Sequence, residues 1–403
     1  MEFDWQAAGG RPDWTAAGAP ALWDALLGQA VAARASDIHV EPMEDALRVR
    51  LRVDGALREI ASLPLAMQPS VCARIKVMAA IDIAEKRRPQ DGRIRYSIGG
   101  EEIDLRVSTL PTIAGEKVAV RLLDRRTALL PVRELGFSEE NLAAYQKLYR
   151  SSYGMILATG PTGSGKTTTL YATLSRLHAP EKNIVTIEDP VEYRIDGINQ
   201  VQVNPKAELT FASLLRSVLR QDPDVVMVGE IRDSETARIA VRAAMTGHLV
   251  LSSLHTNDAA SAVARLGDMG VEGYLLASSL LGVVAQRLVR RICPRCGQPY
   301  VLAEDAPERA LLGARYAPGV VFRRGTGCEA CAQTGYSGRV AAYEILPVTG
   351  QMRAMIARGA TVQELRAAAV RAGMRTLLED ALDKAMAGLT SLREVAKLYG
   401  GLD

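Results

Sequence analysis

The chain is poor in histidine, aromatic residues and net charge, and it has no long apolar run. Its 403 residues include four histidines and 5% aromatic residues, and the formal net charge is only +3. A chain so close to neutral has no broad basic field for nucleic acid or an anionic membrane. The longest apolar stretch, Leu275 to Ala285, is interrupted by serines and a glycine. It is shorter than the ~20 residues that cross a bilayer. The acidic N-terminus, MEFDWQ, lacks a signal-peptide pattern, so we expect a cytoplasmic protein.

Cysteine is scarce as well, and its placement indicates a metal site. Four of the five cysteines form the pairs Cys293-Pro-Arg-Cys296 and Cys328-Glu-Ala-Cys331. Two such pairs can supply the four thiolates of a tetrahedral Zn²⁺ site. A redox pair is the alternative, but a doubled motif in a reducing compartment favours metal. Four thiolates leave no open coordination position, so the ion would stabilise the fold or a docking surface and would not be catalytic. We expect a projecting loop or short helix between the pairs, and we interpret Cys72 as a small core residue.

The first part of the chain is typical of a small α+β domain. Residues 1–35 are predicted to be a loose arm containing Gly and Pro, followed by one helix. Over 36–124, strand patterns surround a helical pattern at 69–83, and Asp54-Gly55 is typical of a two-residue hairpin turn. We place the interdomain linker at 125–137, where Pro and Gly separate patterned segments. The strands that we expect are 47–53, 56–60, 93–98, 102–108 and 117–122.

The remaining residues, 138–403, alternate apolar strands with helices. Short strands that are apolar on both faces imply a parallel sheet covered on both sides, which predicts an α/β fold. The pattern is helical from 261 to 289 and again beyond Tyr343, and a zinc-binding insertion is expected over 292–338. The predicted strands of the parallel sheet are 155–159, 183–187, 225–229 and 249–253.

A phosphate-binding loop follows the first of these strands. Residues 154–169, GMILATGPTGSGKTTT, fit the pattern G-x-x-x-x-G-K-[ST] between an apolar strand and the start of a helix. The glycines let backbone N–H groups turn onto phosphate oxygens, Lys166 reaches the β- and γ-phosphates, and the Thr167 hydroxyl can ligate Mg²⁺. A Gly/Ser-rich turn without function is the alternative, and the strand and helix argue against it. The residues expected to bind nucleotide are Gly160, Pro161, Thr162, Gly163, Ser164, Gly165, Lys166, Thr167 and Thr168.

Acids and histidines occur at the ends of other predicted strands. Phosphoryl transfer needs a carboxylate beside the phosphate loop to hold Mg²⁺ or its waters, and both Glu230 and Glu188 follow apolar strands. Such acids are also common helix caps, but with a phosphate loop we expect both in one crevice. His248 and His255 stand at the two ends of one apolar strand. A histidine there can sense or polarise a γ-phosphate, although a lone histidine is usually structural.

The chain closely resembles the secretion ATPases of the type II secretion and type IV pilus assembly superfamily. Four segments carry the resemblance and look like the family's Walker A, Asp, Walker B and His boxes: GPTGSGKT, TIEDPVEY, LRQDPDVVMVGEIRD and TGHLVLSSLHTND. It extends to SDIHVEP, EKRRPQDGR, RVSTLPTIAGEKVAVRLL and AQRLVRRICPRC. Export members usually carry a further N-terminal domain for docking, and residues 1–35 are too few to form it.

The resemblance implies a RecA-like ATPase core and a homo-hexamer with ATP and Mg²⁺ between the two domains of neighbouring subunits. Glu188 and Glu230 would share metal and attacking-water duties, and either spacing is compatible with the base. Arg106 and Arg121 match arginines that the family uses as γ-phosphate contacts, and a planar guanidinium suits that charge. Without the resemblance, both would be interpreted as residues on a solvated strand face, like Arg50.

These features together predict a Mg²⁺-dependent ATPase that couples hydrolysis to protein export or pseudopilus assembly through a type II secretion system. Its expected partners are inner-membrane secretion-platform proteins, which would hold it at the cytoplasmic face of that membrane. Assembly of a type IV pilus is the alternative. A nucleic-acid translocase is a weaker one, because the chain lacks basic strands interleaved with aromatic residues. A scaffold that binds ATP without turnover is a further alternative.

Overall fold

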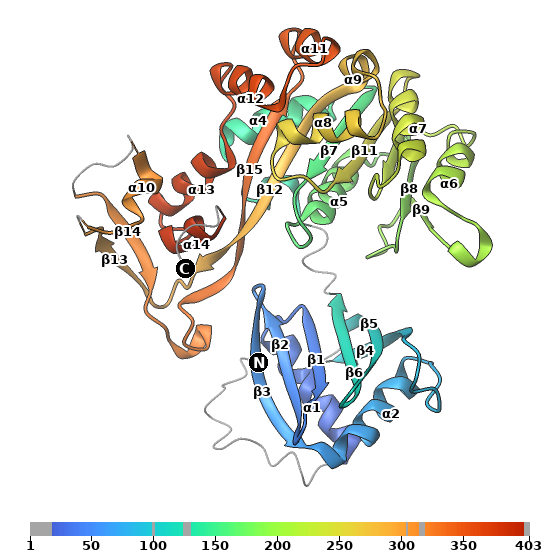
Figure 1. Cartoon of the computed structure of the whole chain (residues 1–403), viewed down its shortest axis with the longest axis vertical. Helices are drawn as coiled ribbons and strands as arrows, with labels where there is room; N and C mark the ends of the chain where they lie inside the picture. Colours follow the sequence, from blue (N-terminus) through green and yellow to red (C-terminus); the bar gives the residue numbers. More distant parts are fainter. Residues whose placement is uncertain (1–17, 99–100, 124–129, 304, 314–318, 399–403) are drawn as a thin grey trace. The chain divides into compact units, whose positions relative to one another are not determined.

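The computed structural model describes residues 18–98, 101–123, 130–303, 305–313 and 319–398. The chain divides into two compact units, Met1–Arg125 and Arg126–Asp403, each with its own core (Figure 1). The arm expected before residue 18 and the part of the linker at 125–129 lie outside the described residues.

The described residues of the first unit form an antiparallel six-stranded sheet and two α-helices, and the strand order is β3-β2-β1-β6-β5-β4. Helix α1 adds Leu22 and Trp23 to its core, so the helix expected within 1–35 belongs to this unit. Cys72 is buried in the same core, as predicted. Asp54 and Gly55 have φ of +49° and +84°, the left-handed conformations that the predicted hairpin turn requires. The elements are α1 (Ala19–Ala32), β1 (Asp37–Pro42), β2 (Ala46–Val53), β3 (Ala56–Pro64), η1 (Leu65–Met67), α2 (Gln68–Met78), β4 (Gln90–Ile98), β5 (Glu101–Thr112) and β6 (Gly115–Leu123).

A seven-stranded sheet in the order β15-β12-β7-β11-β10-β8-β9 forms the centre of the second unit. Strands β7, β11, β10 and β8 are parallel, which confirms the predicted parallel sheet and α/β class. The strands are β7 (Gly154–Thr159), β8 (Ile184–Glu188), β9 (Asn199–Gln202), β10 (Val225–Val228), β11 (Leu249–Leu254), β12 (Leu280–Ile292) and β15 (Tyr336–Pro347).

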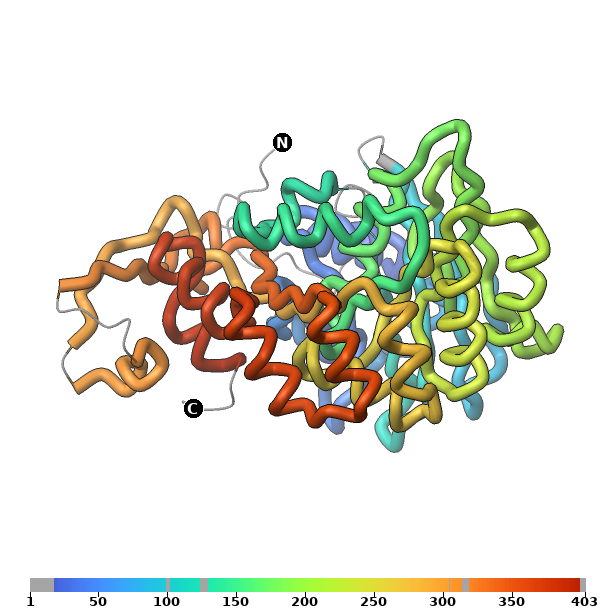
Figure 2. Tube along the Cα trace, turned by 90° about the horizontal axis from the view of Figure 1, so that it is seen from above, coloured from blue at the N-terminus to red at the C-terminus, as the bar shows by residue number. Residues whose placement is uncertain are grey.

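Helices cover both faces of this sheet. Along β7, Met155 and Leu157 face one core, whereas Ile156 and Ala158 face the other, as expected for a strand buried on both sides. Helices α4 and α5 pack on one face, and α6–α9 with α11–α14 on the other. In Figure 2, α4 and the C-terminal helices lie on opposite sides of the unit. The helices are η2 (Val132–Glu134), α4 (Glu139–Tyr149), α5 (Lys166–Leu177), η3 (Pro205–Ala207), α6 (Phe211–Val218), α7 (Ser234–Met245), α8 (Ala259–Asp268), α9 (Gly273–Ser279), α11 (Gly350–Ala357), α12 (Val362–Arg371), α13 (Leu377–Met386) and α14 (Leu392–Lys397).

The helical prediction over 261–289 is wrong beyond Ser279, where the long strand β12 begins. This strand is parallel to β7 and antiparallel to β15, which itself continues to Pro347 where a helix was predicted. The run is apolar on both faces because β12 pairs with a strand on each side and both faces of the sheet are covered. Such a run shows no alternation, so periodicity alone cannot distinguish it from a buried helix.

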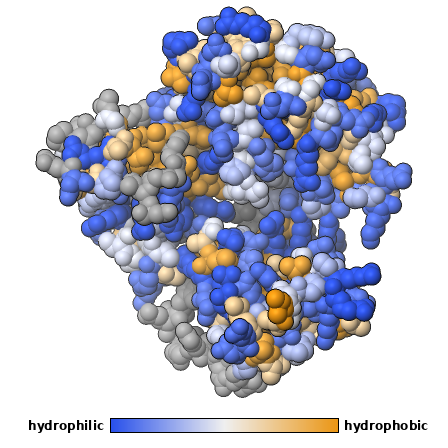
Figure 3. All heavy atoms as spheres, in the orientation of Figure 1, coloured by the Kyte–Doolittle hydropathy of each residue, from blue (hydrophilic) through white to orange (hydrophobic). Residues whose placement is uncertain are grey.

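Across the described part of the chain, no helix is both long and apolar enough to span a membrane. The face of the molecule in Figure 3 is mostly hydrophilic, with apolar residues in separate patches.

Candidate nucleotide site and cysteine cluster

The phosphate loop connects the end of β7 to the start of α5. Gly160, Gly163 and Gly165 have φ of +151°, +78° and +91°, which other residues rarely adopt. A Cβ atom at Gly160 would also lie 2.5 Å from the Gln286 carbonyl oxygen, so this position accommodates only glycine. Helix α5 begins at Lys166, and its free N-terminal N–H groups favour an anion at the loop. Pro161, Thr162 and Thr167 are exposed, Thr168 is partly exposed and Ser164 is buried.

Lys166 folds back over its own loop. Its Nζ donates hydrogen bonds to the carbonyl oxygens of Gly160 (2.8 Å) and Pro161 (3.1 Å). Burial lowers the pKa of Lys166 to about 8; the nearby Glu230 carboxylate opposes this shift, and Arg287 adds to it. The ammonium therefore has weak neutral acceptors, and phosphate oxygens would be stronger partners for it.

Glu230 and His255 come together at the carboxyl edge of the sheet. Glu230 follows β10, and His255 is the first residue after β11. The His255 Nε2 lies 3.4 Å from one Glu230 oxygen, and an Arg232 Nη lies 2.5 Å from the other. Strand β11 separates β10 from β7, so parallel strands deliver these groups to the edge that carries the phosphate loop. Arg232, which the sequence analysis did not single out, also lies 3.9 Å from Asp189.

Glu188, the last residue of β8, is more enclosed than predicted. Its carboxylate is buried and accepts hydrogen bonds from the hydroxyl groups of Tyr171 and Thr186 (2.5 Å for Thr186) and from Gln200 Nε2 (3.1 Å). Burial raises the pKa of Glu188, and these hydrogen bonds only partly offset that effect. The acid is thus held against α5 and β9 by its own neighbours. Tyr171 was missed because it falls in the apolar pattern of the helix.

The prediction that His248 contacts nucleotide does not fit the geometry of one subunit. His248 precedes the six-residue strand β11, and its Nδ1 lies 3.0 Å from the Ala243 carbonyl oxygen. Register pairs Leu249 with Gly154, the residue at the start of β7, whereas the loop follows the end of β7. At roughly 3.3 Å per residue, His248 is about 20 Å from the loop's edge of the sheet. Because His248 and His255 stand at the two ends of one strand, they lie at opposite edges of the sheet, and only one of them can be near the loop.

Arg106 and Arg121 lie directly opposite each other on β5 and β6 of the first unit. The side chain of Arg121 is 58% exposed, and its Nε donates to Asp37 Oδ1 at 3.1 Å. The comparison residue Arg50 is not merely solvated, because it forms a bidentate pair with Glu41 (2.7 and 2.9 Å). Burial opposes ionisation of Glu41, but the hydrogen bonds from Arg50 and Lys117 lower its pKa to about 2. This face of the sheet therefore presents ordered cationic side chains.

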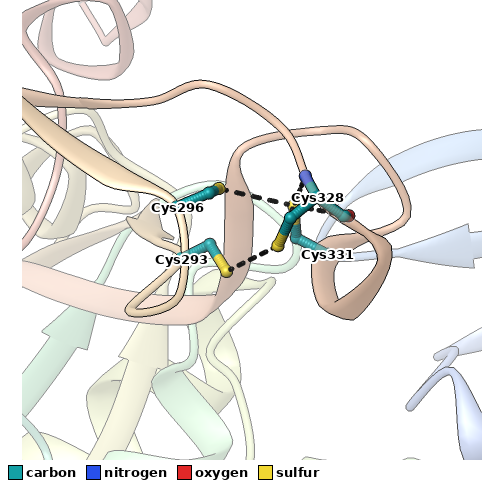
Figure 4. A group of neighbouring side chains, drawn as sticks. All are labelled: Cys293, Cys296, Cys328 and Cys331. Carbon is teal, nitrogen blue, oxygen red and sulfur yellow. Dashed lines mark hydrogen bonds between the residues drawn. The ribbon is translucent and has the colours of Figure 1, made fainter.

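The four paired cysteines form one cluster (Figure 4). The Sγ atoms of Cys293 and Cys328 are 3.8 Å apart, those of Cys296 and Cys331 are 3.8 Å apart, and those of Cys328 and Cys331 are 3.7 Å apart. A tetrahedron with Zn–S bonds of about 2.3 Å has sulfur atoms about 3.8 Å apart, so the cluster fits Zn²⁺.

Backbone groups support the same cluster. Burial opposes ionisation of the Cys331 thiol, but the N–H groups of Cys328 and Gly335, both 3.2 Å from its Sγ, help to lower its pKa to about 6. The described residues between the cysteine pairs include a short helix, as predicted, and also an antiparallel pair of strands that was not predicted. Its elements are β13 (Gly297–Val301), α10 (Arg309–Leu312) and β14 (Val321–Gly325), and η5 (Glu329–Cys331) follows.

Comparisons with known proteins identify the family of the chain. The family described as type II/IV secretion system protein matches residues 16–397. The chain is 51% identical over 378 residues to type II secretion system protein E of Dickeya dadantii, covering 94% of this chain and 75% of the relative. It is 50% identical to type II secretion system ATPase E of Vibrio cholerae, covering 94% and 74%. It is also 50% identical to the type IV pilus assembly ATPase PilB of Thermus thermophilus, covering 90% and 41%.

Solved structures show the same fold. The ATPase DotB of Legionella pneumophila superposes with a TM-score of 0.73 at 21% identity, covering 97% of this chain and 99% of that one. The pilus retraction motor PilT with bound ADP superposes with a TM-score of 0.64 at 25% identity, covering 93% and 96%. Together with the phosphate loop, these matches show that the chain belongs to the type II/IV secretion system protein family and is an ATPase.

Proposed function

We propose that this ATPase works as a homo-hexamer that couples ATP hydrolysis to protein export or pseudopilus assembly by a type II secretion system. The observation that carries the proposal is the complete phosphate loop at the sheet edge that also carries Glu230 and His255. The choice of system follows the relatives named for type II secretion, which share about half of their residues with this chain over 94% of its length.

In this proposal the loop from Gly160 to Thr168 surrounds the phosphates, and Lys166 exchanges its two carbonyl acceptors for phosphate oxygens. Thr167, at the start of α5, would hold Mg²⁺ through its hydroxyl group. When bound, the ion neutralises charge on the β- and γ-phosphates. Glu230 would orient the attacking water. Its charge opposes the lowering of the Lys166 pKa by burial, and its side chain is only partly buried. His255, which lies beside Glu230, would sense or polarise the γ-phosphate.

Glu188 has a different part in the proposal. Its carboxylate is committed to Tyr171, Thr186 and Gln200, so it acts on metal or water only if those partners rearrange. Until then it fixes the end of β8 against α5. The structure therefore favours Glu230 over Glu188 as the base.

Arg106 and Arg121 complete the site from the first unit of a neighbouring subunit. They stand side by side on one sheet face, where two guanidinium groups can meet the charge of a γ-phosphate. A ring of six subunits would supply such a pair to each phosphate loop. Partner proteins of the inner membrane would hold the ring at the cytoplasmic face.

The test is Lys166→Ala, which removes the positive charge that would bind phosphate but no core volume. We expect purified wild-type protein to release phosphate from ATP and the variant to release none while it remains folded, as a cooperative melting transition would show. Normal turnover by the variant would contradict the phosphate-loop mechanism, and a wild type without turnover would support the scaffold alternative.

Addition of single-stranded DNA should leave the rate of phosphate release unchanged, whereas stimulation would favour a nucleic-acid translocase.

Pilus assembly is the second candidate, because PilB of Thermus thermophilus is also 50% identical over 90% of this chain. The two candidates differ in what cells lose. Cells whose only copy carries Lys166→Ala should retain surface pili but fail to release exported proteins into the medium. Loss of pili with normal export would assign the chain to pilus assembly.

A further inference from the structure

Gln286 lies beside the phosphate loop, although it is outside every nucleotide-binding motif considered above. The register of β12 on β7 pairs Ala285 with Thr159, so Gln286 and Gly160 are neighbours where the loop leaves the sheet. The Gln286 carbonyl oxygen occupies the space that a Cβ at Gly160 would need. The Gln286 side chain is buried, and its Nε2 donates to the Ser164 carbonyl oxygen at 2.8 Å. One residue thus contacts both ends of the loop.

This hydrogen bond is independent of the ligand, unlike those of Lys166. A bound phosphate would compete for the Lys166 Nζ and break its bonds to Gly160 and Pro161. The bond from Gln286 to Ser164 uses no group that a phosphate needs. It can therefore hold the loop in the same conformation before and after nucleotide binds.

The bond also fixes the direction of a backbone donor. In a planar trans peptide the C=O and N–H groups point to opposite sides. Because the Ser164 C=O points at Gln286, the Gly165 N–H of the same peptide points away from β12. Gly165 tolerates this orientation with its φ of +91°. Backbone N–H groups of this kind bind phosphate in such loops.

We propose that Gln286 is a positioning residue for the phosphate loop, which holds the Ser164–Gly165 peptide so that its N–H is available to phosphate. The proposal rests on the ATPase function above but adds a residue from a distant strand. If it is correct, removing the amide weakens nucleotide binding in a protein that remains folded. A merely structural amide would change stability and leave affinity alone.

The experiment measures the Kd for ADP with Mg²⁺ by isothermal titration calorimetry, together with thermal melting. We expect Gln286→Leu to weaken ADP binding about tenfold, since it leaves a buried carbonyl unpaired. The KM for ATP should rise by a similar factor with a smaller change in kcat, because the loop holds phosphate in both ground and transition states.

Asn141→Leu is the matched control. Asn141 is also a buried amide of the second unit, and its Nδ2 donates to Asp380 Oδ1 (3.3 Å) and the Tyr343 carbonyl oxygen (3.4 Å), away from the loop. This variant should lower the melting temperature and keep the wild-type Kd. An equal loss of affinity in Asn141→Leu, or a Gln286→Leu affinity within twofold of wild type, overturns the proposal. Failure of wild-type protein to bind ADP would instead refute the proposed function.

Gln286→Glu provides a second readout if the leucine variant does not fold. An ionised carboxylate cannot donate to Ser164, but a protonated one can, and burial raises the pKa of such a group. We expect weak ADP binding at about pH 8 that recovers as the pH falls further, a range over which the wild-type Kd stays nearly constant. An affinity equal to that of wild type at every pH also overturns the proposal.

Discussion

At the residue scale, the charge of Lys166 makes nucleotide binding depend on pH. Burial lowers its pKa to about 8, so the ammonium of the nucleotide-free protein loses its proton as the pH rises through that value. Phosphate stabilises the charged form, and binding above this pH must therefore take up a proton. The same lowered pKa means that the folded chain binds fewer protons than the unfolded chain between about 8 and 10.5, so this lysine destabilises the fold less as the pH rises.

We therefore expect the Kd for ADP to be nearly constant below pH 8 and to rise by up to tenfold per pH unit above it, because one proton is taken up. Calorimetric titration between pH 6.5 and 9.5 measures this dependence. Lys166→Arg is the control, since a guanidinium keeps its charge over the whole range. A wild-type Kd that stays constant up to pH 9.5 would contradict a lowered pKa for Lys166.

The two glutamates are expected to respond differently to loss of charge. Glu230→Gln and Glu188→Gln should both bind ATP and lose turnover, since both keep the shape and remove an acid. Only Glu188→Gln should also lower the melting temperature, because its amide N–H₂ would face either the Tyr171 hydroxyl or, in the other orientation, the donors of Thr186 and Gln200. Phosphate release, nucleotide titration and thermal melting separate the cases. Wild-type turnover by Glu230→Gln would remove this residue from the mechanism.

At the element scale, the sequence predicted those parts of the fold that follow local rules. The strands β7, β8, β10 and β11 and the phosphate loop have short-range patterns, and each was placed within a residue or two. The strand β12 was not, because its run is buried on both faces and resembles a buried helix. Gln286 was missed for the same reason, as its contact with Ser164 depends on which strand pairs with β7. Likewise, the burial of Glu188 depends on Tyr171, which no spacing rule connects with it.

The cysteine cluster should hold about one zinc ion per chain, as four thiolates fill one tetrahedral site. Replacing Cys293 and Cys296 with serine should remove the metal and increase hydrogen exchange over residues 292–338, with partial loss of ATPase activity. Cys72→Ala is the control, because Cys72 is buried in the other unit and should not affect metal content. Metal analysis and exchange measurements test this. Metal-free protein with unchanged local exchange would refute a structural role.

At the scale of the whole molecule, the phosphate loop and the two arginines belong to different compact units. If a neighbour supplies the arginines, ATPase activity should rise more steeply than linearly with protein concentration. Arginine supplied in this way is worth about a thousandfold or more in rate. A fully active dilute monomer would contradict supply from a neighbour.

Mixing two inactive variants provides a sharper test. Rings that contain Lys166→Ala and Arg121→Ala subunits should regain some turnover, because certain interfaces would receive an intact loop and an intact arginine. Arg58→Ala, at a partly exposed position on β3 of the same unit, is the control and should be active alone. Mixed rings that form but remain inactive would show that Arg121 does not act across the interface.

The strand β12 also limits how the chain can change in length. It carries Gln286 at the phosphate loop and ends at Ile292, immediately before the metal ligand Cys293. Side chains alternate along β12 up to the register irregularity between Arg290 and Ile292, so one residue inserted or deleted before it would turn the side chains that follow to the opposite face. Two inserted residues would keep the faces but shift Cys293 by about 6.6 Å. Substitutions between these positions are therefore tolerable where insertions are not, and a chimera that exchanges the cysteine hairpin must keep β12 intact.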